Sequence, residues 1–205
     1  MKPIGYYNYT VIATYLGLAA ALCGCYLATQ DQCRLALLCL ILAGCFDMVD
    51  GRIASTRPRT EDERSFGIQI DSLCDLVSFG VLPSMIMLCF PLPLPLCILI
   101  GILFTLAAII RLSYYNVTEI NRQRNEGGKR TSYLGLPVTC DALLLPMVYL
   151  LSPLLGDVFG WVYAAALLVI GILFLTPFRM PKASPRMMIA MSLVGALTVA
   201  MLFVI

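Results

Sequence analysis

Asp47-Met-Val-Asp50-Gly51-Arg52-Ile53-Ala54 and Gly67-Ile-Gln69-Ile-Asp71-Ser72-Leu-Cys-Asp75 are the two stretches around which this chain is organised. Their four carboxylates are at the facing ends of two apolar segments. Asp47 and Asp50 are three residues apart and Asp71 and Asp75 are four apart, so each pair lies on one face of a helix. Four like charges in apolar surroundings repel one another and are costly to desolvate. A divalent metal bound by carboxylate oxygens would compensate them.

The composition is that of a membrane protein. The chain has 205 residues, of which 60% are hydrophobic and 13% charged, with a mean hydropathy of +0.88. Soluble domains carry about 25% charged residues. The sequence contains no His, which removes the usual zinc ligand and the usual base at neutral pH. Nine Cys lie mostly inside apolar runs without paired spacing, so we interpret them as small packing residues.

Apolar segments of about 20 residues, the length that spans a bilayer, predict an all-α polytopic transmembrane bundle. The resulting single domain covers residues 1–205, with a catalytic core over about 5–140 and further spans over about 141–205. We count seven spans and leave six or eight open. They are 9–29, 34–55, 67–90, 95–117, 135–154, 157–177 and 185–205.

Basic residues set the expected orientation, since Lys and Arg concentrate in cytoplasmic connections. With the N-terminus inside, thirteen of the fourteen Lys and Arg fall on the cytoplasmic side and Arg34 alone falls outside. This predicts an integral protein of the cytoplasmic (inner) membrane, with the four acids at its cytoplasmic face. Thr60 and Glu63 have the spacing of a helix capping box, although a solvated turn is the alternative we favour for the acids Glu61 to Glu63.

At the acids the chain resembles the CDP-alcohol phosphotransferase family, whose pattern is Asp-x2-Asp-Gly-x2-Ala-Arg-x8-Gly-x3-Asp-x3-Asp. Seven of its eight elements are matched, namely Asp47, Asp50, Gly51, Ala54, Gly67, Asp71 and Asp75. Ser55 stands where the family has Arg, and eleven residues rather than eight separate it from Gly67. Arg52, Arg57 or Arg59 could replace the missing guanidinium.

Further motifs resemble the phosphatidylserine synthase branch of this family. They are the continuation of the second stretch through Ser78-Phe79-Gly80 to Pro83, the segment Arg111-Leu-Ser-Tyr-Tyr-Asn116, and Gly135-Leu-Pro137. Asn8-x-Thr10 is similar to a family motif ahead of the first span, with imperfect spacing. The resemblance covers about residues 5–140.

The resemblance implies a reaction and its cofactors. CDP-diacylglycerol would enter from the inner leaflet, and L-serine would attack its β-phosphorus so that CMP leaves. Two divalent ions, Mg²⁺ or Mn²⁺, would be bridged by Asp47 and Asp71 and completed by Asp50 and Asp75. Asp75 would also take the proton of the serine hydroxyl. Family membership further implies a homodimer among membrane lipids, with no nucleic-acid partner.

Substrate contacts follow from the same motifs. The nucleotide would lie against Asn8, Gly51, Ala54, Ser55 and Gly67. The zwitterionic serine needs a cation and hydrogen-bond acceptors, and the candidates are Gln69, Ser78, Arg111 and Asn116.

Each of these candidates has a structural alternative. Arg111 could anchor a lipid phosphate or set topology, and Gln69 and Ser78 could join helices by hydrogen bonds. The small residues of the motif could simply allow tight helix packing. The basic cluster Arg122, Arg124, Lys129 and Arg130 is typical of a contact with anionic lipid, and Tyr6, Tyr7 and Tyr9 of the membrane interface.

Two other functions remain open on the sequence alone. The first is a sister transferase that uses glycerol phosphate or inositol phosphate as the acceptor, or an archaeal lipid as the donor. The second is a divalent-cation transporter, for which acids midway through the spans would be needed. The acids here are expected at helix ends beside a basic loop.

Overall fold

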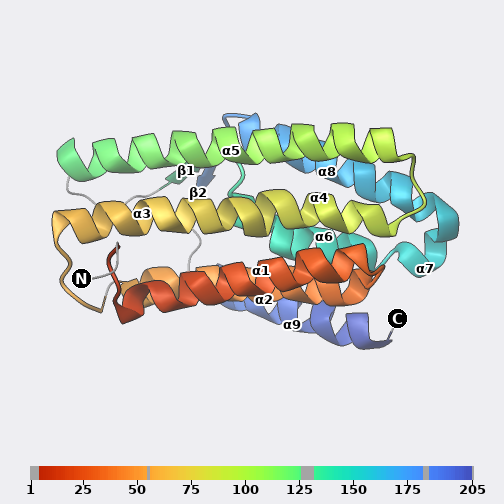
Figure 1. Ribbon diagram of the computed structural model, residues 1–205, viewed down its shortest axis with the longest axis horizontal. Coiled ribbons are helices and arrows are strands. Elements are labelled where there is room, and N and C mark those ends of the chain that lie inside the picture. The colour runs from red at the N-terminus through yellow and green to blue at the C-terminus, as the bar shows by residue number, and fades with distance from the viewer. Residues whose placement is uncertain (1–4, 55, 126–131, 182–184, 205) are drawn as a thin grey trace.

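Helices form almost the whole of this computed structural model and lie side by side along its long axis (Figure 1). The structure describes residues 5–54, 56–125, 132–181 and 185–204. The helical elements are η1 (Tyr9–Val11), α1 (Ile12–Thr29), α2 (Cys33–Ala54), α3 (Glu61–Asp75), η2 (Leu76–Val81), α4 (Leu82–Ile86), η3 (Met87–Cys89), α5 (Leu94–Asn125), η4 (Val138–Cys140), α6 (Asp141–Tyr149), α7 (Ser152–Leu155), η5 (Gly156–Val158), α8 (Phe159–Leu175) and α9 (Pro185–Val204).

The structure confirms the predicted all-α membrane bundle. Four helical stretches among the described residues are long and apolar enough to cross a membrane: Tyr9–Thr29, Glu61–Cys89, Leu94–Asn121 and Ser152–Leu175. Val138–Tyr149 and Ala190–Val204 are apolar but shorter. Helix α2 has 22 residues, but its second half carries Asp47 and Asp50. The length and composition of these helices are therefore those of an integral membrane protein.

The third helical stretch starts six residues earlier than the predicted span over 67–90. Thr60 is the N-cap of α3, its side chain accepts the backbone N–H of Glu63, and the Glu63 carboxylate accepts the N–H of Thr60 at 3.0 Å. The spacing of these residues indicated this capping box correctly, whereas the favoured solvated turn was wrong. The reciprocal bonds satisfy two amide groups that would otherwise be unpaired. As a result, α3 to η3 form one 29-residue stretch.

Helix α5 is also longer than predicted. It runs over Leu94–Asn125 in place of 95–117, because no helix-breaking residue occurs before Gly127-Gly128. Its 32 residues correspond to a length of about 48 Å at 1.5 Å per residue, against about 30 Å for the hydrocarbon core of a bilayer. One end of α5 therefore extends beyond the apolar layer.

A π-helical turn, η2, directly follows the last acid of α3. The buried Gly80 lies in this turn, and its carbonyl oxygen accepts hydrogen bonds from Ser84 Oγ and Thr105 Oγ1, each at 3.0 Å. A Cβ at position 80 would lie 3.2 Å from Ala108 of α5. Two hydroxyl groups, one from α4 and one from α5, thus bond the Gly80 carbonyl. Turns of this kind often occur at functional sites.

Thr105→Val tests whether this bond holds α5 against the π turn. We expect a loss of about 0.6–1.7 kcal/mol, the range measured for hydrogen bonds between membrane helices. Thermal unfolding in detergent, or unfolding in mixed micelles, measures this loss. Thr118→Val is the control, since the Thr118 hydroxyl bonds the Tyr115 carbonyl within α5 itself. Equal stability of the two variants would show that the bond to Gly80 adds nothing.

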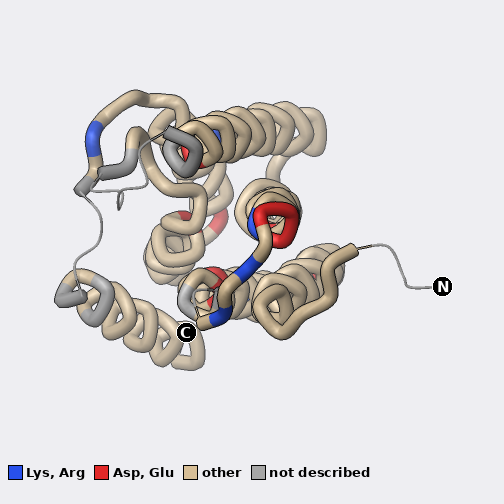
Figure 2. Tube along the Cα trace, turned by 90° about the vertical axis from the view of Figure 1, so that its left-hand side faces the viewer, with Lys and Arg blue, Asp and Glu red and all other residues tan. Residues whose placement is uncertain are grey.

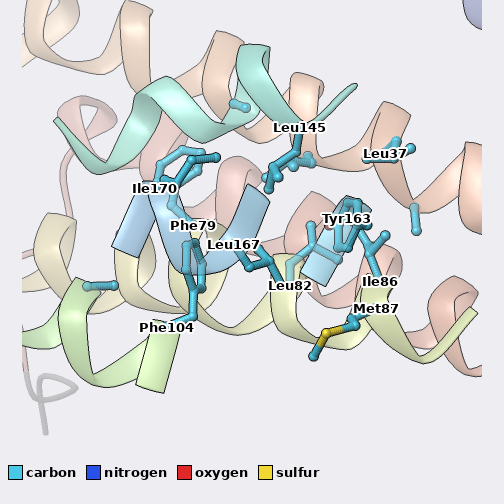
Figure 3. Packing of buried hydrophobic residues seen from close by; sticks show 14 of the residues in the cluster. Leu37, Phe79, Leu82, Ile86, Met87, Phe104, Leu145, Tyr163, Leu167 and Ile170 are labelled. Atoms are coloured by element: carbon cyan, nitrogen blue, oxygen red, sulfur yellow. The ribbon is translucent and has the colours of Figure 1, made fainter. Parts of the chain in front are cut away.

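The core joins the third helical stretch to α5, α6 and α8 (Figure 3). Phe79 and Leu82 pack here with Phe104 of α5 and Leu167 of α8, and all four are at most 1% exposed. Tyr163 is completely buried, and its hydroxyl donates to the Pro83 carbonyl at 3.1 Å. This bond ties α8 to the helix that carries Asp71 and Asp75.

Two short strands, which the sequence did not lead us to expect, pair near one end of the bundle. Strand β1 (Ser132–Leu134) runs antiparallel to β2 (Arg179–Pro181), with Tyr133 opposite Met180. Gly135 follows with a φ of 77°, and its N–H donates to the Phe178 carbonyl at 2.7 Å. A side chain at Gly135 would be strained at this φ and would crowd the Phe174 and Thr176 carbonyls. The turn thereby directs the chain into η4 and α6.

Figure 2 looks along the bundle from the end at which α2 ends and α3 begins. Basic residues mark the connection between the two helices, and acidic residues follow at the start of α3. The N-terminal segment packs on the same end, since the Tyr6 and Phe66 rings lie 5.5 Å apart and Tyr9 Oη lies 2.9 Å from Thr56 Oγ1. The Asp62 carboxylate raises the pKa of Tyr6. Tyr9 therefore contacts the connection and Tyr6 contacts α3, while their location at the membrane interface stays a prediction.

Candidate active site

Three of the four predicted acids come together between α2 and α3. One carboxylate oxygen from each of Asp47, Asp71 and Asp75 lies within 4.8 Å of the others, and all three side chains are partly buried. Oxygens on opposite sides of a Mg²⁺ ion are about 4 Å apart, given bonds of 2.0–2.1 Å. The three carboxylates therefore have the spacing and the hard oxygen donors that a divalent ion needs.

The fourth acid, Asp50, lies beside this group. Its side chain is 9% exposed, and Asp50 Oδ2 accepts a hydrogen bond from Thr14 Oγ1 of α1 at 3.2 Å. The charge of its carboxylate also acts on Asp71. Sequence reasoning missed Thr14, because a single hydroxyl in an apolar helix carries no distinguishing pattern.

Thr14→Val tests the support given to Asp50. Loss of the hydroxyl leaves a buried carboxylate oxygen without its donor, and loss of such supporting bonds typically weakens metal binding by about 10- to 100-fold. Titration calorimetry of the purified chain with Mn²⁺ measures this change. Thr29→Val is the matched control, because Thr29 bonds a backbone carbonyl at the other end of α1. Indistinguishable affinities for the two variants would exclude a role for Thr14 at the metal site.

Asp47 and Asp50 lie in the last turns of α2, which runs to Ala54, as predicted. Asp71 and Asp75 do not lie at the start of a helix as predicted. Asp75 is the last residue of the 15-residue α3, but the helical stretch continues without a break to Cys89. The difference arises because the capping box moves the helix start to Glu61, well before Asp71.

Two glycines of the motif border open or polar space. A Cβ built on Gly51 would meet no atom within 4 Å, so this face of α2 can be approached closely by a ligand. A Cβ on Gly67 would lie 3.2 Å from Arg59 Nη1. Of the arginines proposed to replace the missing family Arg, Arg59 is thus placed against the motif, whereas Arg57 is ion-paired with Glu63 at 3.4 Å.

Of the other predicted nucleotide contacts, Asn8 is among the described residues. Asn8 caps η1, where its Oδ1 accepts from the backbone N–H and the hydroxyl of Thr10. Ser55 lies outside the described residues, as does the side chain of Ala54. Also outside them are Lys129 and Arg130 and the side chains of Arg52, Arg122 and Arg124.

The four serine-binding candidates occupy different surroundings. Ser78 is buried in the π turn, whereas Gln69 is exposed on α3. Asn116 Oδ1 accepts from Ser72 Oγ at 2.8 Å, which ties α5 to α3 next to Asp71. The structure therefore places Ser78 and Asn116 near the acids, and gives Gln69 no comparable setting.

Arg111 points into the protein. It is 6% exposed, its Nε donates to the Leu136 carbonyl at 3.1 Å, and its guanidinium carbon lies 5.8 Å from the centre of the Tyr115 ring. This burial does not fit an anchor for lipid phosphate at the surface. It leaves the alternative of an inward-facing cation, near the middle of the long helix α5 rather than at the end of a span as predicted.

Sequence reasoning missed a fifth acid, Asp141, which begins α6 and is 0% exposed. The charge of its carboxylate acts on Asp75. Asp141 is a single acid in the otherwise apolar span predicted over 135–154. Only the packing of α6 against α2 brings it to the other acids.

A separate groove of about 420 Å³ lies between α4 and α5, away from the acids. Its walls include Val81, Ser84, Met85, Gly101, Thr105 and Ile109. The lining is predominantly apolar, and none of the clustered acids contributes to it.

Comparison with known proteins identifies the class to which this fold and site belong. The family model described as CDP-alcohol phosphatidyltransferase matches residues 8–177, so the chain belongs to this family. The match extends beyond the region of about 5–140 that the motifs indicated. Membership in a transferase family favours an enzyme over the cation transporter considered from the sequence.

The names of several relatives agree with the phosphatidylserine synthase branch of the family. The chain is 38% identical over 112 residues to CDP-diacylglycerol–serine O-phosphatidyltransferase of Saccharomyces cerevisiae, covering 54% of this chain and 40% of the relative. It is 34% identical over 125 residues to archaetidylserine synthase of Methanothermobacter thermautotrophicus, covering 60% and 50%. A CDP-diacylglycerol–serine O-phosphatidyltransferase of Helicobacter pylori is 26% identical over 180 residues, covering 85% and 70%. The chain thus matches half or less of the first two relatives.

Proposed function

We propose that this chain transfers a phosphatidyl group from CDP-diacylglycerol to the hydroxyl of L-serine, giving phosphatidylserine and CMP. The observation that carries the proposal is the cluster of Asp47, Asp71 and Asp75 on two motif helices of a CDP-alcohol phosphatidyltransferase. The names of the relatives support serine as the acceptor. The active unit is a single domain over residues 1–205.

The acids serve the donor side of the reaction. Asp47, Asp71 and Asp75, with Asp50 held by Thr14, would bind two divalent ions, Mg²⁺ or Mn²⁺. When bound, such ions neutralise phosphate charge and orient the leaving group. Gly51 leaves room for the nucleotide, and Arg59 beside Gly67 supplies a positive charge for its phosphates. Asn8, Ala54 and Ser55 complete the proposed nucleotide contacts.

Asp75 acts as the base on the acceptor side. Its carboxylate takes the proton from the serine hydroxyl as the new P–O bond forms and the bond to CMP breaks. A carboxylate is a weak base, but proton transfer has only to keep pace with bond formation. The buried Arg111 binds the serine carboxylate. Ser78 and Asn116 provide neutral hydrogen bonds near it, and the exposed Gln69 is a further candidate for this role.

The membrane setting follows from the basic connections. The site would open at the cytoplasmic face of the cytoplasmic membrane, where the donor lipid reaches it from the inner leaflet. We further propose a homodimer, which chemical cross-linking in membranes and light scattering in detergent would detect. A monomer by both methods would contradict it.

An acceptor panel tests the function. Purified full-length chain with Mn²⁺ or Mg²⁺ receives CDP-diacylglycerol together with L-serine, glycerol 3-phosphate or inositol 1-phosphate, and CMP release is measured. We expect release with L-serine alone, together with phosphatidylserine. Release with another acceptor and none with serine would assign the chain to a sister transferase. A second series with the CDP-activated archaeal ether lipid tests the donor, because one relative is an archaetidylserine synthase.

A further inference from the structure

Asp141 is a buried acid whose carboxylate has no partner. Within the described residues, the two Asp141 oxygens are the buried side-chain nitrogen or oxygen atoms that lack a hydrogen bond. A carboxylate taken out of water without a partner is costly, by several kcal/mol in proteins. A cationic group bound against the Asp141 oxygens would remove this cost.

The position of Asp141 relates it to the acid cluster. Helix α6 packs tightly on α2, since a Cβ on Gly44 would lie 2.8 Å from the Ala142 Cβ. Gly44 is one turn before Asp47, so the start of α6 faces the same side of α2 as that acid. The Asp141 charge acts on Asp75. Asp141 therefore lies at the start of a helix that packs on α2 beside the turn that carries Asp47.

Asp141 is nevertheless outside the group that could share one metal ion. That group contains Asp47, Asp71 and Asp75, whose ligand oxygens fall within 4.8 Å of one another, and Asp141 does not meet this criterion. Asp50 is likewise outside this group, so the Mn²⁺ requirement of an Asp141 variant, measured below, distinguishes an organic cation from a metal ion.

A buried positive charge lies near the start of α6. Arg111 bonds the Leu136 carbonyl, five residues before Asp141 in the chain. The charges of Asp141 and Arg111 both act on Cys140, as does that of Asp47. The Arg111 guanidinium of α5 and the unpartnered Asp141 carboxylate of α6 thus both lie in the surroundings of Cys140.

We propose that Asp141 binds the ammonium group of the amino-acid acceptor and thereby selects an amino alcohol over a neutral or phosphorylated one. The inference rests on the proposed function and adds a specificity-determining residue to it. In serine the amino and hydroxyl groups are on adjacent carbons, so a hydroxyl at Asp75 brings the ammonium close to a neighbouring carboxylate. A phosphate in the same position would be repelled by Asp141.

The test compares Asp141→Asn with the wild type on two acceptors. L-Serine carries the ammonium, and 3-hydroxypropionate is the same molecule without it. Asp157→Asn is the matched control, since Asp157 is an exposed acid in η5. A charged hydrogen bond of this kind corresponds to about 10- to 100-fold in affinity. We expect Asp141→Asn to raise KM for L-serine by this factor and to leave 3-hydroxypropionate and CDP-diacylglycerol unaffected.

Several results would overturn the inference. One is an equal loss of activity with both acceptors, which indicates a structural role. Another is a shift in the Mn²⁺ requirement of Asp141→Asn, which would make Asp141 a metal ligand. Loss of an unpartnered charge should leave thermal stability equal or higher, and Asp141→Ala repeats the measurement with a smaller side chain. If the wild type releases no CMP with serine, the proposed function itself fails, which is a distinct result.

Discussion

Asp75→Asn should lose turnover while it still binds CDP-diacylglycerol, whereas Asp71→Asn should lose both. The two acids are one turn apart, but their neighbours differ. The charges of Asp47 and Asp50 act on both acids, and the charge of Asp141, on the proposed acceptor side, acts in addition on Asp75. Loss of a general base typically costs about 10²- to 10⁴-fold in rate.

The measurement combines donor affinity at saturating Mn²⁺ with serine-dependent CMP release for both variants. Glu61→Gln is the control on the same helix, because Glu61 is exposed in the first turn of α3. Wild-type turnover in Asp75→Asn would exclude its role as the base. Loss of donor binding as severe as in Asp71→Asn would make Asp75 simply another metal ligand.

Removal of divalent metal should abolish CMP release, and Mn²⁺ or Mg²⁺ should restore it. The reason is electrostatic, because three carboxylates with oxygens within 4.8 Å of one another repel both each other and the phosphates of a CDP-lipid. A bound ion should also stabilise the fold, by about 2.7 kcal/mol at 100 times its dissociation constant.

Exhaustive dialysis against EDTA, followed by addition of each ion, tests this expectation. CMP release and the melting temperature are recorded in parallel. The double variant Asp47→Asn, Asp71→Asn is the control, and its melting temperature should no longer respond to Mn²⁺. Full activity of the wild type after chelation would exclude the metal role altogether.

Much of the fold could be predicted because the relevant signals are local. Long apolar runs located the helices, and the spacing of Asp47 with Asp50 and of Asp71 with Asp75 indicated which acids share a helix face. Helix ends were less predictable where competing signals met. The acids after Thr60 resembled a solvated turn, yet the capping box made them the first turn of α3.

The remaining site features depend on tertiary packing. Thr14 and Asp141 are single polar residues in apolar segments, and their meaning appears only when α1 and α6 pack on α2. The π turn after Asp75 and the pairing of β1 with β2 likewise have no periodic signature in the sequence. Residues brought together from distant segments cannot be found from spacing within one helix.

The placement of the acids on consecutive helices bears on how the protein is made. Chains fold from the N-terminus as they are synthesised. All four motif acids lie on α2 and α3, which follow one another directly along the chain, while Asp141 begins α6. The metal-binding half can therefore assemble in the membrane as a helical hairpin before the residue proposed to choose the acceptor has left the ribosome.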